Sequence, residues 1–74
     1  MKNNKELKIV RDTFVSETTS ENKQILSAEF TEHIKSITPD GYHLKQMPKY
    51  NDEYAEIDGV HRWRVEYAVI FVEN

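Results

Sequence analysis

The chain contains no cysteine, only two glycines and two prolines, and no long apolar run. Without cysteine it can form neither a disulfide bond nor a metal site with thiolate ligands. The two glycines, Gly41 and Gly59, are far apart in the chain, which excludes the glycine-rich loops that bind phosphate groups. The longest apolar run, residues 68–72, is far shorter than the about 18 residues that a membrane-spanning helix needs. We therefore expect no cofactor and no membrane contact.

Seventy-four residues are enough for one small domain. We expect residues 1–74 to form a single domain, with a flexible tail at residues 1–5. Ordering the chain costs about 1.5 kcal/mol per residue, and a chain this short has little core with which to offset that cost. Close packing, or burial of further surface against other copies or a partner, must therefore supply part of the stability.

Acidic residues slightly outnumber basic ones, thirteen against ten, which gives a formal net charge of −3. This charge argues against a dedicated DNA-binding protein, because such proteins usually carry a basic stripe. The first residues are basic but are not followed by the apolar core of a signal peptide, so we expect a cytoplasmic protein. A composition rich in lysine, asparagine, isoleucine and glutamate is common in AT-rich bacterial and phage genomes.

One segment in the first half of the chain has the apolar spacing of a helix. Its apolar residues fall on one helical face, with polar residues opposite: Leu26, Phe30, Ile34 and Ile37. Thr18 and Glu21 have the spacing of a capping box at its start, and Ser20 is an alternative cap. Pro39 cannot donate the next helical hydrogen bond and Gly41 permits a positive φ, so the helix must end before them.

Alternation of apolar and polar residues predicts strands in the rest of the chain. Residues 6–15 form the first strand and residues 42–47 the second, with Pro48 marking an edge position, a bulge or the strand end. Segment 54–57 then resumes extended pairing, and Asp58-Gly59 predicts a tight hairpin turn of type I′. The last strand follows, and its inner face carries five apolar residues: Trp63, Val65, Tyr67, Val69 and Phe71.

Together these elements predict an α+β fold of the order β–α–β–β, a three-stranded antiparallel sheet with one helix packed on one face. The core then consists of the apolar stripe of the helix against the inner face of the last strand, with Leu44 beside it. The helix covers only one sheet face, so apolar residues on the other face are exposed unless something else packs on them. We therefore predict a protein–protein interface at Ala68, Ile70 and Val72.

The segment 60–71 (VHRWRVEYAVIF) has an aromatic residue, then a polar residue, then alternating apolar residues. With its β–α–β–β order and length, the chain resembles the dodecins, a family of small proteins that assemble into hollow spheres and bind flavin. Flavin-binding members carry a tryptophan at the start of the second strand and a glutamine in the third, where this chain has Tyr42 and Arg64. The resemblance implies the fold and self-association, with small-ligand binding in such an oligomer as an alternative function.

The sequence contains no motif of a known catalytic chemistry, and we expect neither catalytic residues nor a metal site. The acidic residues between Asp52 and Asp58 are predicted to form a solvated loop, because they lack the spacing and central glycine of a calcium loop. His33, His43 and His61 come from three different elements, and we expect three separate surface histidines rather than ligands of one metal ion.

Two arginines and two tyrosines suggest a second kind of surface. Arg62, Arg64, Tyr50 and Tyr54 could together stack nucleotide bases and contact phosphates. The alternative is that the arginines pair across strands with Glu53 or Glu56, while Trp63 belongs to the core.

The sequence thus predicts a small non-enzymatic binding or assembly protein that acts by self-association or by contact with a partner protein. Binding of single-stranded nucleic acid is the alternative. An inhibitor encoded by a phage and directed at a host protein is compatible with the composition.

Overall fold

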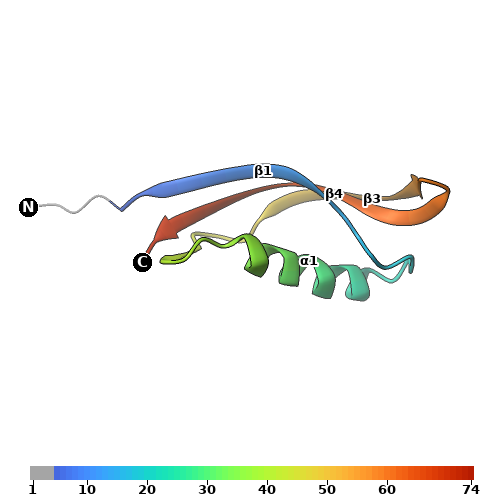
Figure 1. The fold of residues 1–74 in the computed structure, drawn as a ribbon, viewed down its shortest axis with the longest axis horizontal. Helices are drawn as coiled ribbons and strands as arrows, with labels where there is room; N and C mark the ends of the chain where they lie inside the picture. The colour runs from blue at the N-terminus through green and yellow to red at the C-terminus, as the bar shows by residue number, and fades with distance from the viewer. Residues whose placement is uncertain (1–4) are drawn as a thin grey trace, which may run out of the picture.

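The computed structural model describes residues 5–74. Most of the predicted flexible tail, residues 1–4, lies outside the described residues. The described chain forms one helix and four strands: β1 (Leu7–Val15), α1 (Lys23–Ile37), β2 (Tyr42–Leu44), β3 (Lys49–Ile57) and β4 (Val60–Glu73). The strands make one antiparallel sheet, and α1 lies along one face of it (Figure 1). The α+β class, the single helix and the antiparallel sheet are confirmed.

Strand β4 is the centre of the sheet because every other strand pairs with it. On one side β1 pairs along its whole length, from Leu7 opposite Val72 to Val15 opposite Arg64. On the other side β3 pairs with residues 60–68 and β2 with residues 71–73. The expected three strands are four because β2 and β3 lie end to end along the same edge of β4.

The break between β2 and β3 corrects the predicted boundaries. The second strand ends at Leu44 rather than Met47, and extended pairing resumes at Lys49 rather than Tyr54. Pro48 has no N–H to donate to β4, so the chain leaves the edge just before it and returns just after it. The predicted acidic loop is also wrong, because Asp52 and Glu53 lie within β3, opposite Val65 and Arg64.

The turns agree with the predicted chemistry. Asp58 and Gly59 both have positive φ, 53° and 82°, and they connect Ile57 directly to its partner Val60. Positive φ at both central residues defines the predicted type I′ turn. The helix ends at Ile37, before Pro39 as the sequence predicts, and Thr38 is its C-terminal cap.

The helix start differs from the prediction. Its cap is Asn22, whose side-chain oxygen accepts a hydrogen bond from the Gln24 N–H at 2.8 Å. Thr18 and Ser20, the predicted caps, instead accept backbone N–H groups two residues further on, at 3.1 Å each. The segment before α1 therefore consists of successive side-chain turns, and the helix begins only at Lys23.

The core lies between α1 and the sheet face that it covers, here called the inner face. The five predicted β4 residues are all buried, from fully enclosed Val65 and Phe71 to Trp63 at 6% exposure. Leu26, Phe30 and Ile34 of α1 close over them, while Ile37 and Leu44 are half-buried at the margin. The predicted core is confirmed.

Candidate functional site

The outer face, which α1 leaves uncovered, has an apolar end. Ala68, Ile70 and Val72 of β4 lie there and are half-buried. Their β1 neighbours are Leu7, opposite Val72, and Ile9, opposite Ile70, and these two are 48% and 63% exposed. We call these five residues the outer apolar patch.

The sequence reveals the β4 half of this patch but not its full extent. Leu7 and Ile9 follow the alternation of the first strand, yet only the strand register shows that they lie beside Ile70 and Val72. They are more exposed than their neighbours because β1 is an edge strand, whereas β4 is flanked on both sides.

A hollow of about 210 Å³ adjoins the patch where the chain leaves the sheet between β2 and β3. Ile9, Ala68, Ile70 and the 83%-exposed Met47 form part of its wall. Arg11 and Lys49 also line it, because both lie opposite Ala68 on its two neighbouring strands. The apolar patch is thus bordered, beside Ala68, by two cationic side chains.

The free edge of β1 borders the same patch. Hydrogen bonds from Ser16 N–H to the Trp63 carbonyl (2.9 Å) and from Glu73 N–H to the Glu6 carbonyl (3.0 Å) show that even-numbered residues face β4. In an antiparallel ladder the intervening odd-numbered residues point their N–H and C=O groups the other way. One of these groups, the N–H of Thr13, donates a hydrogen bond to the Asp12 carboxylate at 2.7 Å.

The two arginines of the predicted nucleic-acid surface are engaged with the protein itself. Arg64 forms an ion pair with Glu53, its partner across β3 and β4. Arg62 donates hydrogen bonds to the backbone carbonyls of Ser16 and Glu17. The first of these contacts confirms the alternative interpretation of cross-strand pairing for Arg64.

The two tyrosines of that surface lie on the other side of the sheet. The Tyr50 ring packs against Phe30 of α1, with ring centres 5.2 Å apart. Tyr54 packs against Trp63 at 5.2 Å, and its hydroxyl donates to the Thr19 carbonyl. Because these tyrosines face α1 while Arg64 lies on the outer face, the structure does not bring the four predicted residues into one surface.

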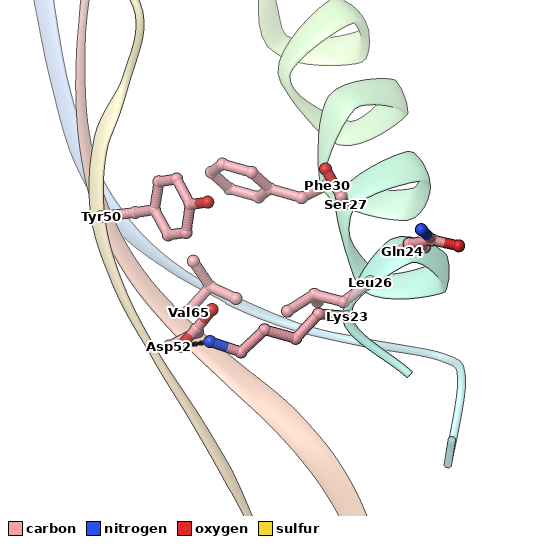
Figure 2. A pocket seen from close by; sticks show the side chains of 8 residues that line it. All are labelled: Lys23, Gln24, Leu26, Ser27, Phe30, Tyr50, Asp52 and Val65. Atoms are coloured by element: carbon pink, nitrogen blue, oxygen red, sulfur yellow. Dashed lines mark ion pairs between the residues drawn. The ribbon is translucent and has the colours of Figure 1, made fainter. Parts of the chain in front are cut away.

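A groove lies between α1 and β3, lined by side chains of both elements (Figure 2). A hollow of about 270 Å³ in this groove is lined by Lys23, Gln24, Leu26, Ser27, Phe30, Tyr50, Asp52 and Val65. Figure 2 shows Phe30 and Tyr50 facing each other across it, with Lys23 reaching over to Asp52 at 3.6 Å. The charges that line this groove therefore neutralise each other, and its wall offers no nucleophile beside a base.

Two tyrosine hydroxyls are perturbed by their surroundings. Burial, together with the charge of Asp12, raises the pKa of Tyr67, whose hydroxyl lies 3.0 Å from Nε2 of His33. The Tyr42 hydroxyl donates to the Glu6 carboxylate. This hydrogen bond, then desolvation and the charges of Glu6 and Glu73, raises the pKa of Tyr42 to about 12. Both contacts join separate elements of the fold.

The histidines occupy separate environments. His33 stacks on Phe14 with ring centres 4.6 Å apart, His43 is hydrogen-bonded to the Asn74 side chain, and His61 lies 5.5 Å from the Tyr54 ring. Among residues 5–74, no three His, Cys, Asp or Glu side chains lie close enough to hold a metal ion. Within the same range no helix is both long and apolar enough to span a membrane.

Comparisons with protein-family models, curated proteins and solved structures find no match to this chain. The dodecin resemblance therefore rests on the sequence alone, and the function must be argued from the surfaces described above.

Proposed function

We propose that this protein is a non-enzymatic assembly module that associates with further copies of itself through the outer apolar patch. The observation that carries the proposal is the clustering of Leu7, Ile9, Ala68, Ile70 and Val72 on the one sheet face that α1 leaves open. A contiguous exposed apolar patch on a small soluble domain is typical of an interaction surface.

The shape of the molecule supports the same conclusion. Its Cα radius of gyration is 14.6 Å, whereas a compact domain of this length has about 11 Å. The fifteen-residue helix spans about 22 Å, while the fourteen-residue β4 spans about 46 Å. One short helix against a long narrow sheet leaves much surface exposed, and association is the means by which a chain without disulfides can bury more of it.

The polar groups support a structural rather than a catalytic role. The side chains that chemistry would need are engaged within the fold: His33 with Tyr67, Arg64 with Glu53, and Lys23 with Asp52. A binding module needs none of them free, because its affinity comes from apolar burial and fit.

Sedimentation velocity at micromolar concentration tests the proposal. We expect the wild-type chain to form oligomers and Ile70→Glu to stay folded but lose association through the patch, because a charge in the patch cannot be buried without a partner. Val60→Glu is the matched control: it lies on the same strand, is 40% exposed and is outside the patch. It should associate like the wild type. A wild-type chain that stays monomeric while Ile70→Glu melts unchanged would refute self-association.

A further inference from the structure

We propose that two copies pair antiparallel through the free edges of β1, with the two-fold axis at Val10, so that Lys8 of each copy faces the partner's Asp12. This inference rests on the proposed self-association and adds a second contact to it, at the sheet edge beside the outer apolar patch. It joins two four-stranded sheets into one continuous sheet, in which the two outer apolar patches become neighbours.

The backbone of β1 is open along this edge. Leu7, Ile9 and Arg11 point their N–H and C=O groups away from β4, as the alternation of the β1–β4 hydrogen bonds requires. An edge strand with unpaired backbone groups is a template for pairing with another strand. β1 runs for nine residues without a proline, a glycine or a break in its register with β4.

The opposite edge of the sheet is less suited to pairing. There the edge is divided between β2 and β3, and the chain leaves it around Pro48. Proline and interruptions of this kind are devices that prevent edge pairing. The two edges of β4 thus differ, and the uninterrupted one carries the exposed Leu7 and Ile9.

Charge selects one register for the pair. Only odd-numbered β1 residues direct backbone groups to this edge, so the axis lies at a residue, and near the strand centre the choices run from Lys8 to Thr13. An axis at Asp12 sets that carboxylate opposite its own copy, and an axis at Thr13 forms no charged pair. An axis at Lys8 or Arg11 sets that cation opposite its own copy, and an axis at Ile9 sets Glu6 opposite the partner's Asp12. Like charges directly opposite each other destabilise a sheet, whereas opposite charges stabilise it.

An axis at Val10 turns the same charges into two attractive pairs. Lys8 and Asp12 lie two residues on either side of Val10 and share the inner face with it. Inward-pointing charges of one sign on an edge strand would repel a second copy. Opposite signs placed symmetrically about the axis are self-complementary, because each Lys8 meets the partner's Asp12.

The pairing requires one local exchange of hydrogen bonds. In the free chain the Asp12 side chain accepts the Thr13 N–H at 2.7 Å. In the pair this N–H donates to the carbonyl of the partner's Leu7, which releases the Asp12 carboxylate for the partner's Lys8. The Lys8 ammonium, now 5.0 Å from the centre of the Tyr42 ring, lies on the same inner side.

The layers of the two copies fit together in this arrangement. Strand β4 and its copy are separated by three strand spacings, about 14 Å. The two helices cover the same face of the joined sheet and are about 10 Å in diameter, so they can lie side by side. On the other face Ile9 lies opposite the partner's Arg11 and diagonal to the partner's Ile9, so the two patches border each other.

Single cysteines test the register directly, because the chain contains no native cysteine. Three full-length variants, Ile9→Cys, Val10→Cys and Arg11→Cys, each place two sulfurs together for one position of the axis. At a non-hydrogen-bonded antiparallel pair the Cα atoms lie about 4.5 Å apart, within the range that a disulfide bridges. Under mild oxidation we expect Val10→Cys to form a covalent dimer at least tenfold faster than the other two.

The outcomes separate this inference from the proposed function. Faster cross-linking at position 9 or 11, or none at any position in a chain that sediments as an oligomer, overturns the β1 pairing at Val10 and leaves self-association standing. A reduced chain that sediments only as a monomer overturns both.

Charge reversal provides a second readout that a purely structural role would not give. Lys8→Glu should weaken dimerisation about tenfold, because each Glu then faces the partner's Asp12. The double variant Lys8→Glu with Asp12→Lys restores opposite charges and should recover most of the affinity. Failure of the double variant to recover, with both chains folded by circular dichroism, contradicts the register.

Discussion

Toward its C-terminal end β4 carries apolar residues on both faces, but in different surroundings. Trp63, Val65, Tyr67, Val69 and Phe71 on the inner face are between 0% and 6% exposed. Ala68, Ile70 and Val72 alternate with them on the same strand but are only half-buried. The difference arises because α1 covers one face alone. The apolar character of a strand residue therefore does not show whether it belongs to the core or to a surface. That depends on whether another element packs on its face of the sheet.

The largest expected effect comes from the inner face. Trp63→Ala removes a side chain that is 6% exposed and whose indole N–H donates to the Ser20 carbonyl at 2.8 Å. Large-to-small substitution of a buried aromatic residue costs about 3–5 kcal/mol, much of the stability of a small domain. Urea denaturation followed by circular dichroism measures the loss. A wild-type tryptophan emission that is red-shifted and readily quenched by iodide would contradict this burial.

Ser16 offers a smaller test at the end of the same face. It is 2% exposed, and its hydroxyl oxygen accepts the Trp63 N–H at 3.0 Å while donating to the Thr18 carbonyl at 2.8 Å. Ser16→Ala leaves a buried N–H without a partner and should lower the free energy of unfolding by about 1–3 kcal/mol. The exposed Ser27→Ala is the control and should stay near wild type. Equal stability of the two variants would show that the Ser16 contact is dispensable.

The neighbour of Trp63 on the outer face should respond weakly. Arg64→Ala breaks the ion pair with Glu53, in which both side chains are about half-exposed. Exposed ion pairs contribute about 0–1 kcal/mol because water and salt screen them. Denaturation in low and high salt measures this difference. A loss of stability as large as that of Trp63→Ala would contradict the expected difference between the two faces.

The smallest expected effect concerns the end of the sheet. The hydrogen bond from the Tyr42 hydroxyl to Glu6 is the main cause that raises the pKa of Tyr42 from 10.0 to about 12 in the folded chain. A raised folded pKa favours folding below pH 10, and this contribution is lost as the pH rises through about 12. Glu6→Gln should return the Tyr42 titration towards its ordinary range. Tyrosinate absorbance, compared with Tyr42→Phe, measures the shift, and identical curves for wild type and Glu6→Gln would refute the contact.

Local chemistry made several parts of the fold predictable. The five inner residues of β4 follow from alternation, the helical stripe from its spacing, and the hairpin from Asp58-Gly59 with its two positive φ angles. Each of these features depends on residues close together in the sequence. For the same reason Ala68, Ile70 and Val72 could be assigned to the outer face without a structure.

Other features depend on contacts that alternation does not encode. The polar strand β3 carries Asp52 inwards and Glu53 outwards, so it has no apolar face and looks like a loop until it is paired with β4. The separation of Tyr50 from Arg64 likewise follows only from strand register. The contribution of Leu7 and Ile9 to the patch needs the pairing of β1 with β4, which joins residues more than fifty positions apart.

One matched pair of variants tests the division between the faces most directly. Val69 and Ile70 are adjacent in β4 and point to opposite sides; Val69 is 1% exposed, whereas Ile70 belongs to the outer apolar patch. Analytical ultracentrifugation of Val69→Glu and Ile70→Glu, with the folded state of each sample checked by circular dichroism, compares the same charge on the two faces. We predict that Val69→Glu is unfolded, because an unpaired charge in the core costs more than about 4 kcal/mol. We predict that Ile70→Glu stays folded and forms smaller assemblies than the wild type, because the patch contact is lost. An Ile70→Glu chain that unfolds like Val69→Glu, or that assembles like the wild type, would contradict the account.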